Sequence, residues 1–237
     1  MRDILRDSLD ELSITYDDER ISKLNKFYEM LVEKNKVINL TTITEYDDVV
    51  VKHFADSLAV VKYILIKEGM RALDLGTGAG FPGIPLAIFY PRTEFVLLDS
   101  VNKKLKFINE VKTELGLDNV SVVHGRAEKL AHTEMYREKF DLIFSRAVSN
   151  MSTLAELSLG FLKTDGCFVA YKSEETDAEI ADAAKAIRLM GGELGKEISI
   201  KLPYTEINRM LYLINKVSKT PNRYPRKAGD PKRNPIR

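Results

Sequence analysis

The sequence contains a single cysteine, Cys167, among its 237 residues. One thiol excludes a disulfide framework and a cysteine-based zinc site, and such low cysteine usage is typical of a reducing compartment. No segment approaches the roughly 18 apolar residues of a membrane-spanning helix, and Met1-Arg2-Asp3 does not lead into the apolar core of a signal peptide. His124 has no second histidine at metal-ligand spacing. We therefore expect a cytoplasmic protein with no membrane partner and no metal.

The composition, 44% hydrophobic and 30% charged, is that of an ordinary globular chain, long enough for one large or two small domains. Its net charge of +1 conceals an asymmetry. The segment Lys216–Arg237 holds eight basic residues and one acid, a charge of +7, so the rest of the chain carries −6. A basic tail on an acidic body is typical of a polyanion-binding protein, and the alternative is a tail that only aids solubility.

The most informative stretch begins with the apolar run Met70–Leu75, which predicts a short buried strand that ends at Gly76. Gly76, Gly78 and Gly80 then alternate with other residues, so the backbone is free to adopt positive φ and no Cβ keeps a ligand away. Pro82 suits the first turn of a helix, where its missing N–H costs nothing. The pattern predicts a strand, a glycine turn and a helix whose amino end can bind an anionic group.

Two cofactor classes use such a turn. Gly78–Gly83 matches the dinucleotide pattern G-x-G-x-x-G, but that pattern is weak evidence alone, and its first glycine should follow the strand directly. The whole run Asp74-x-Gly76-x-Gly78-x-Gly80 instead resembles motif I of the class I methyltransferases. There the strand-end carboxylate, here Asp74, can accept a hydrogen bond from the ammonium group of S-adenosylmethionine, directly or through water. The remaining alternative is a tight turn that binds no ligand.

The rest of the pattern predicts an α/β protein. Residues 1–67 indicate an N-terminal helical cap with a break near Asn39–Thr42, and 68–217 indicate alternating strands and helices that end in a hairpin. The expected strands after the first are 93–99, 120–123, 140–144, 166–171, 194–202 and 209–217, with helices 102–115 and 176–190. We therefore expect a seven-stranded, mainly parallel, doubly wound sheet. The tail 218–237 contains half of the eight prolines and should be extended and weakly folded until bound.

Side chains at the strand ends supply the candidate site. Asp99 ends the second strand, where an acid can bind ribose hydroxyls, and the alternative is a helix N-cap, for which Ser100 or Asn102 would serve equally. Ala127 follows the third strand and should lie close to an adenine ring. Lys104 and its neighbouring lysines should form the solvated face of the helix 102–115.

The fourth strand ends at Ser145-Arg146-Ala147-Val148 and lacks the Asn/Asp-Pro-Pro-aromatic run of nucleobase amino-group methylases. Methylases of pyrimidine C5 need a cysteine nucleophile here or one strand later, but Cys167 lies inside a strand and is better explained by core packing. His53 and Asp56, with Ser57, are either a small polar site or a buried histidine with local helix bonds.

Several runs together resemble the bacterial RsmG family, also called glucose-inhibited division protein B, from about residue 17 to the end. They are 74–88, 98–100, 126–128, 145–148, 219–229, 39–41 and 53–58. The resemblance implies a class I methyltransferase that uses S-adenosylmethionine to methylate N7 of a guanosine in 16S rRNA. The implied cofactor contacts are Gly76, Phe81, Ala127, Glu128 and Arg146, with Asp99 as the ribose ligand.

Guanine N7 carries a lone pair and no proton, so we expect no general base and no catalytic residue of that kind; Arg146 should only orient backbone or cofactor. The expected partner is 16S rRNA or the 30S subunit, and the protein should be a monomer. In the tail, six basic residues should contact phosphates, and Tyr224 could stack on a base. They are Lys219, Arg223, Arg226, Lys227, Lys232 and Arg233. Two rivals remain: a methyltransferase of small molecules, and a ribosome-assembly factor without activity.

Overall fold

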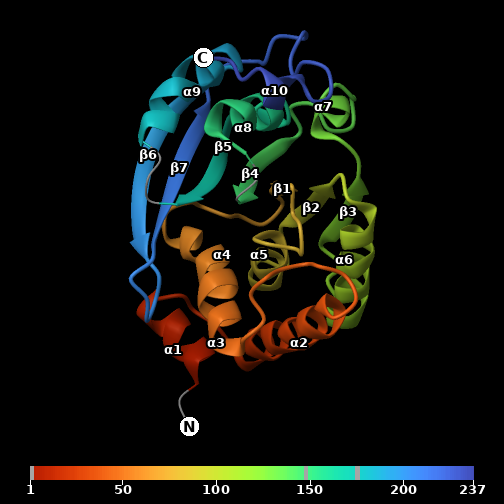
Figure 1. Cartoon of the computed structure of the whole chain (residues 1–237), viewed down its shortest axis with the longest axis vertical. Coiled ribbons are helices and arrows are strands. Elements are labelled where there is room, and N and C mark those ends of the chain that lie inside the picture. The colour runs from red at the N-terminus through yellow and green to blue at the C-terminus, as the bar shows by residue number, and fades with distance from the viewer. Residues whose placement is uncertain (1–2, 147–148, 174–176) are drawn as a thin grey trace.

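The computed structural model describes residues 3–146, 149–173 and 177–237, and in these residues seven strands form one sheet (Figure 1). The strands are β1 (Arg71–Leu75), β2 (Glu94–Asp99), β3 (Val120–His124), β4 (Phe140–Arg146), β5 (Leu162–Ser173), β6 (Gly192–Lys201) and β7 (Asn208–Lys216). Their order is β3-β2-β1-β4-β5-β7-β6. Strands β1 to β5 pair in parallel, and β7 runs antiparallel to both β5 and β6. The predicted sheet is thereby confirmed, with its closing hairpin.

Helices precede the sheet and connect its strands. The N-terminal part contains α1 (Ile4–Glu11), α2 (Asp18–Asn35), α3 (Tyr46–Val49), the π-helical turn η1 (Val50–Ala55), α4 (Asp56–Leu58) and the 3-10 turn η2 (Ala59–Lys62). The later helices are α5 (Gly83–Phe89), α6 (Asn102–Leu115), α7 (Ala127–Leu130), α8 (Met151–Ser158), α9 (Asp177–Leu189) and α10 (Asp230–Arg233). Thr176, the expected first residue of the helix before β6, lies outside the described residues.

The sheet is covered on both faces because its inner strands are apolar at successive positions. Ala72 and Phe95 belong to a core shared with α1, α2, α5 and α6, whereas the neighbouring Leu73 and Val96 belong to a second core with α8 and α9. Side chains alternate between the faces of a strand, so one apolar run supplies both cores. The N-terminal helices therefore pack on the sheet itself, and the limits drawn at 67/68 and 217/218 stay a prediction.

Helix α8 was not predicted from the sequence. Two parallel neighbours such as β4 and β5 need a crossover connection, and α8 lies within that connection. Its N-cap is Asn150, whose side chain accepts a hydrogen bond from the N–H of Thr153 at 2.9 Å. Almost every residue of the helix is buried, and at 8 residues it is too short for its apolar spacing to identify it in the sequence.

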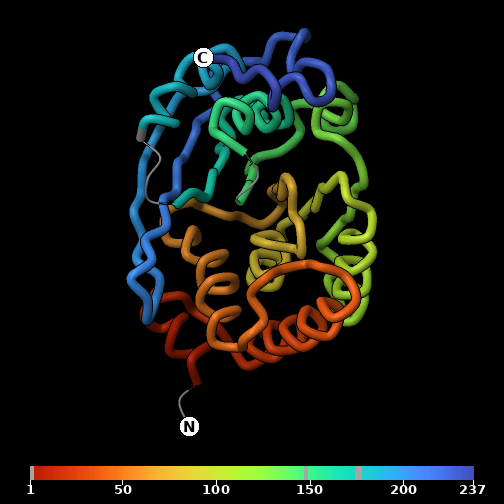
Figure 2. Tube along the Cα trace, in the orientation of Figure 1, coloured from red at the N-terminus to blue at the C-terminus, as the bar shows by residue number. Residues whose placement is uncertain are grey.

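The C-terminal tail differs from the expectation of a weakly folded segment. It runs alongside the α7 and α8 end of the molecule (Figure 2) and is joined there to the body by buried contacts. Arg226 forms an ion pair with Glu156, at 2.7 Å between Nη2 and Oε2, and the Glu156 side chain is only 1% exposed. Because a buried carboxylate needs a partner, this pair fixes a segment that its prolines and charges alone would leave extended.

Candidate active site

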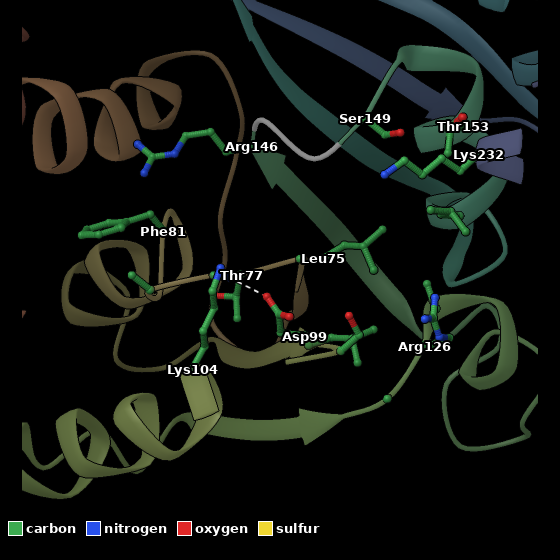
Figure 3. A pocket seen from close by; sticks show the side chains of 18 of the residues that line it. Leu75, Thr77, Phe81, Asp99, Lys104, Arg126, Arg146, Ser149, Thr153 and Lys232 are labelled. Atoms are coloured by element: carbon green, nitrogen blue, oxygen red, sulfur yellow. Dashed lines mark hydrogen bonds between the residues drawn. The ribbon is translucent and has the colours of Figure 1, made fainter. Parts of the chain in front are cut away.

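A cavity of about 520 Å³ opens at the carboxyl ends of β1 to β4. Its walls come from the glycine turn after β1, the ends of β2 and β4, the turn after β3, the N-terminal helices and the C-terminal tail. Figure 3 shows side chains from these elements around one shared space. Parallel sheets bind ligands at this edge, so the cavity is the candidate site.

The side chain of Asp74, which is fully buried near the end of β1, stabilises the glycine turn. Its Oδ2 accepts hydrogen bonds from the Thr77 hydroxyl at 2.6 Å and from the Gly83 N–H at 2.9 Å. A Cβ on Gly83 would lie 2.6 Å from that same oxygen, so only glycine fits there. Gly78 adopts φ +60°, and a Cβ built on it would meet no atom closer than 4.0 Å and would stand in open space. The turn is thus a cradle with room for a ligand.

Asp74 itself does not line the cavity. Burial raises the pKa of its carboxyl to about 6. Its Oδ1 is buried and accepts no hydrogen bond in the part of the chain that the structure describes. Contact between Asp74 and a cofactor ammonium group therefore stays a prediction. An unpartnered buried acceptor beneath the turn fits a cationic ligand nearby.

Asp99 lines the cavity at the end of β2. Its Oδ2 accepts the N–H of Gly78 at 2.9 Å, and its Oδ1 accepts the N–H of Val101, the N-cap of α6, at 2.8 Å. Each carboxylate oxygen keeps a further lone pair for a donor such as a ribose hydroxyl. The structure thus gives Asp99 a role at the start of α6 as well as a place on the cavity wall, and its ribose contact stays a prediction.

Ala127 and Glu128 begin α7 and also line the cavity. Glu128 has a second function that the sequence did not indicate, because its Oε1 accepts the N–H of Gly229 at 2.9 Å. This bond joins two cavity walls that are 101 residues apart in the sequence.

Arg146, at the end of β4, lies in a polar cluster with the N-terminal helices. Its Nη1 donates to Asp56 Oδ2 at 2.9 Å and to the Lys52 carbonyl at 3.2 Å, and its Nη2 lies 3.2 Å from His53 Nδ1. The guanidinium lies 5.1 Å from the centre of the Phe81 ring, and the His53 ring stacks on Phe81 at 4.5 Å. Figure 3 shows Arg146 and Phe81 on the same side of the cavity. Ala147 and Val148 of the same motif lie outside the described residues.

Charge balance in this cluster depends on Asp56, which is fully buried. It accepts hydrogen bonds from two guanidinium groups, Arg146 and Arg209, the latter at 2.7 Å between Nε and Oδ1. Burial, together with the charge of Arg146, lowers the pKa of His53 to about 4, so the imidazole is neutral at pH 7. His53 lines the cavity and Asp56 lies behind it. Sequence reasoning did not identify Arg209, because 153 residues separate it from Asp56.

Of the six tail cations proposed for RNA, Lys232 lines the cavity and the other five do not. Lys219, Arg223 and Lys227 are exposed, and the guanidinium of Arg223 lies 5.0 Å from the centre of the Tyr224 ring, which packs on the body. Arg226 is different, because its guanidinium is engaged with Glu156. The RNA contacts of these residues stay predictions, and for Arg226 the geometry favours a structural role.

Sequence reasoning did not place Lys104 and Lys232 at the cavity. Lys104 was expected on a solvated helix face but lies on the cavity wall, and Lys232 reaches the same cavity from the tail (Figure 3). Lys104 could have been suspected because it follows Asp99 within two turns. Lys232 was expected to contact RNA phosphates from an extended tail, and only the folding of the tail brings it to the cavity.

Other chemistries find little support in residues 3–146, 149–173 and 177–237. These residues contain no group of three or more His, Cys, Asp or Glu side chains that could hold a metal ion. Burial in β5 raises the pKa of the Cys167 thiol to about 11, which leaves it protonated at neutral pH and unsuited to act as a nucleophile. None of the helices described is long and apolar enough to cross a membrane.

The strand order, the glycine turn and the cavity at the carboxyl edge define the fold of the class I S-adenosylmethionine-dependent methyltransferases. A SAM-dependent methyltransferase from Aquifex aeolicus has this fold, with a TM-score of 0.55 and 20% identity over 77% of this chain and 97% of that one. The fibrillarin pre-rRNA processing protein of Methanococcus jannaschii is also similar, with a TM-score of 0.55 and 18% identity over 69% and 74% of the two chains.

Residues 20–203 match the GidB family, described as rRNA small subunit methyltransferase G. The chain is 44% identical to "Ribosomal RNA small subunit methyltransferase G" of Lachnoclostridium phytofermentans over 96% of this chain and 94% of that protein. It is 43% identical to the protein of the same name from Alkaliphilus oremlandii over 100% and 99% of the two chains. The chain belongs to this family, and the resemblance noted in the sequence is confirmed.

Proposed function

We propose that the protein transfers the methyl group of S-adenosylmethionine to N7 of a guanosine in 16S rRNA of the small ribosomal subunit, in the cytoplasm and as a monomer. The observation that carries the proposal is that the glycine turn, Asp99, Arg146 and His53 all line the same cavity. Membership of the rRNA small subunit methyltransferase G family supports it.

One half of the cavity suits the cofactor, which when bound supplies an electrophilic methyl group on a sulfonium. The backbone at Gly76 and Gly78 permits close approach, since neither residue has a side chain. Asp99 would bind the ribose hydroxyls through its free lone pairs, and Ala127 and Glu128 would hold the adenine. All five residues line the cavity.

The other half suits a guanine base. Its N7 attacks through an in-plane lone pair and loses no proton, so the chain needs no general base. His53, with a pKa of about 4, holds no proton at pH 7 that it could donate as an imidazolium, and the guanidinium of Arg146 donates hydrogen bonds but accepts none. The task of these residues is orientation, which contributes roughly 7–11 kcal/mol in well-aligned systems.

The guanine becomes positively charged during methyl transfer, and an unpaired guanidinium nearby would repel that charge. The Asp56 carboxylate does not line the cavity, and it offsets the positive charge of Arg146 through an ion pair of 2.9 Å between Oδ2 and Nη1. Phe81 covers one side of the same guanidinium. Arg146 thus keeps its hydrogen-bonding capacity toward a carboxylate or a phosphate, and its repulsion of the methylated base is reduced.

Radiolabelled methyl transfer tests the proposal. The labelled cofactor is offered with 30S subunits, with naked 16S rRNA and with a pool of small metabolites, and digestion of the product identifies the modified nucleoside. We expect label in 7-methylguanosine from one or both RNA substrates. Label found only in small molecules would establish a metabolite methyltransferase. Cofactor and subunit binding without any transfer would establish an assembly factor that retains the fold.

A further inference from the structure

Four cationic side chains line the cavity, and three of them make no ion pair with any residue that the structure describes. Arg146 is paired with Asp56 at 2.9 Å. Lys104, Arg126 and Lys232 have no such partner, and Arg126 and Lys232 are exposed. Single unpaired cations also occur elsewhere on the surface, but these three gather at one cavity opening, and this gathering calls for an explanation.

The acidic side chains of the cavity do not neutralise these cations. Asp99 accepts the backbone N–H groups of Gly78 and Val101, and Glu128 accepts the N–H of Gly229. These bonds leave the negative charge of each carboxylate in place. With His53 neutral, four cationic side chains therefore face two acidic ones, and the cavity opening is net positive.

The cofactor does not account for this positive charge. S-adenosylmethionine carries a sulfonium, an ammonium and a carboxylate, so its own net charge is +1 and free cations at the opening disfavour its entry. The positive opening instead suits an anion that arrives separately from the cofactor. A nucleic-acid backbone is such an anion, because each phosphate carries one negative charge.

We propose that Lys104, Arg126 and Lys232 form a phosphate-binding rim that positions the RNA strand on either side of the target guanosine; this inference rests on the proposed function. The three side chains come from α6, from the turn after β3 and from α10, and Figure 3 shows them on different sides of the cavity. A strand that contacts all three crosses the opening. A guanosine turned out of its stack is thereby directed toward Arg146 and His53.

The tail places Lys232 at the rim before any RNA arrives. Pro231 is buried, and its carbonyl accepts the hydroxyl of Thr153 at 2.9 Å. The Gly229 N–H bonds to Glu128, and the Arg226 guanidinium is paired with Glu156. Binding to a preorganised group costs less ordering entropy than binding to a mobile tail. The anchored tail is thus part of the RNA-binding surface through Lys232, in addition to its exposed cations.

A triple variant with Lys104→Gln, Arg126→Gln and Lys232→Gln tests the rim. Binding of a 16S rRNA fragment is measured over a salt series, and cofactor binding is measured by calorimetry. We expect RNA affinity to fall at least tenfold at low salt. The slope of log K against log salt should become shallower by roughly 0.7–0.9 for each phosphate that is no longer neutralised. Cofactor affinity should stay the same or improve, since only cations are removed.

The matched control carries Lys62→Gln, Lys67→Gln and Lys196→Gln, three exposed lysines that do not line the cavity. It changes the net charge equally and should alter the slope much less. Equal slopes in the two triple variants would overturn the rim while leaving the proposed function intact. Failure of the wild type to methylate any RNA that it binds would overturn the function instead. Loss of cofactor binding in the triple variant would indicate that this variant is not correctly folded. The single variants Lys104→Gln and Lys232→Gln then provide the same test, because each of them removes one of the cations that bind phosphate.

Discussion

The carboxylate of Asp99 accepts a hydrogen bond from the backbone N–H of Gly78 at 2.9 Å, which ties the end of β2 to the turn after β1. The same carboxylate accepts the N–H of Val101 at the start of α6. Three parts of the cofactor half of the cavity therefore share one side chain. A change at either Gly78 or Asp99 should disturb both the cradle and the proposed ribose site.

Gly78→Val should abolish detectable binding of S-adenosylmethionine. Valine at φ +60° is strained by about 1–2 kcal/mol, and its side chain would stand in the open space above the turn. Calorimetry on the folded variant measures the effect. Gly116→Val is the matched control, because Gly116 has φ +61° and no atom within 4 Å of its Cβ position, but lies at the end of α6 outside the cavity. Near-wild-type affinity in Gly78→Val would remove the assignment of the glycine turn to the cofactor.

Asp99→Ala should weaken the cofactor by roughly 1.5–3 kcal/mol, the range for a hydrogen bond to a charged group. A cofactor analogue without ribose hydroxyls separates the two roles of Asp99. The wild type should bind this analogue less tightly than the parent compound, whereas Asp99→Ala should bind both equally. Unchanged affinity with a lower melting temperature would show that Asp99 serves only the start of α6.

His53 should make stability depend on pH below neutrality. Its folded pKa of about 4 lies below the ordinary value of 6.5, so the unfolded chain takes up the proton first on acidification. The contribution is fully present above pH 6.5 and is lost as pH falls toward 4, an effect of about 3 kcal/mol. Urea unfolding at pH 7 and pH 4 should show a larger loss in the wild type than in His53→Gln. Equal losses would mean that the imidazole is not held neutral.

Lys219, Arg223 and Lys227 should add to RNA affinity through charge alone. Replacing all three by Gln should flatten the salt dependence of RNA binding by roughly 0.7–0.9 in slope for each phosphate contact. Cofactor affinity should not move, because none of the three lines the cavity. If the slope of log K against log salt equals that of the wild type, these three residues do not contact phosphates and this part of the tail only aids solubility.

Arg226→Gln should act differently from its three neighbours and lower stability. It leaves the Glu156 carboxylate, 1% exposed, without its main partner, which should cost about 1.5–3 kcal/mol. Urea unfolding measures the loss, and limited proteolysis should cut the tail faster than in Lys227→Gln. A stability equal to that of Lys227→Gln would mean that the ion pair does not anchor the tail.

The sequence alone was enough for the sheet and for placing Gly76, Gly78 and Asp99 at one edge of it. Met70–Leu75, the alternating glycines and the acid at Asp99 form a local pattern, because strand, turn and helix follow one another along the chain. The helix predicted at 102–115 is α6 as observed. Helix α8 was not predicted because its 8 residues are fewer than the roughly 11–18 over which helical periodicity can be recognised.

Only the tertiary structure decided the cluster around Arg146, the half of the cavity proposed for guanine, and the fold of the tail. Asp56 meets Arg209 across 153 residues, Glu128 meets Gly229 across 101, and Glu156 meets Arg226 across 70. The sequence indicated Asp56 and Glu128 as candidates for the site and gave no indication for Glu156, but nothing local specifies the partner of any of the three. Buried carboxylates require partners, and the packing of the two faces of the sheet determines which cations can reach them. Because of that packing, the C-terminal tail, whose composition predicts a weakly folded segment, is folded against the body and lines part of the cavity.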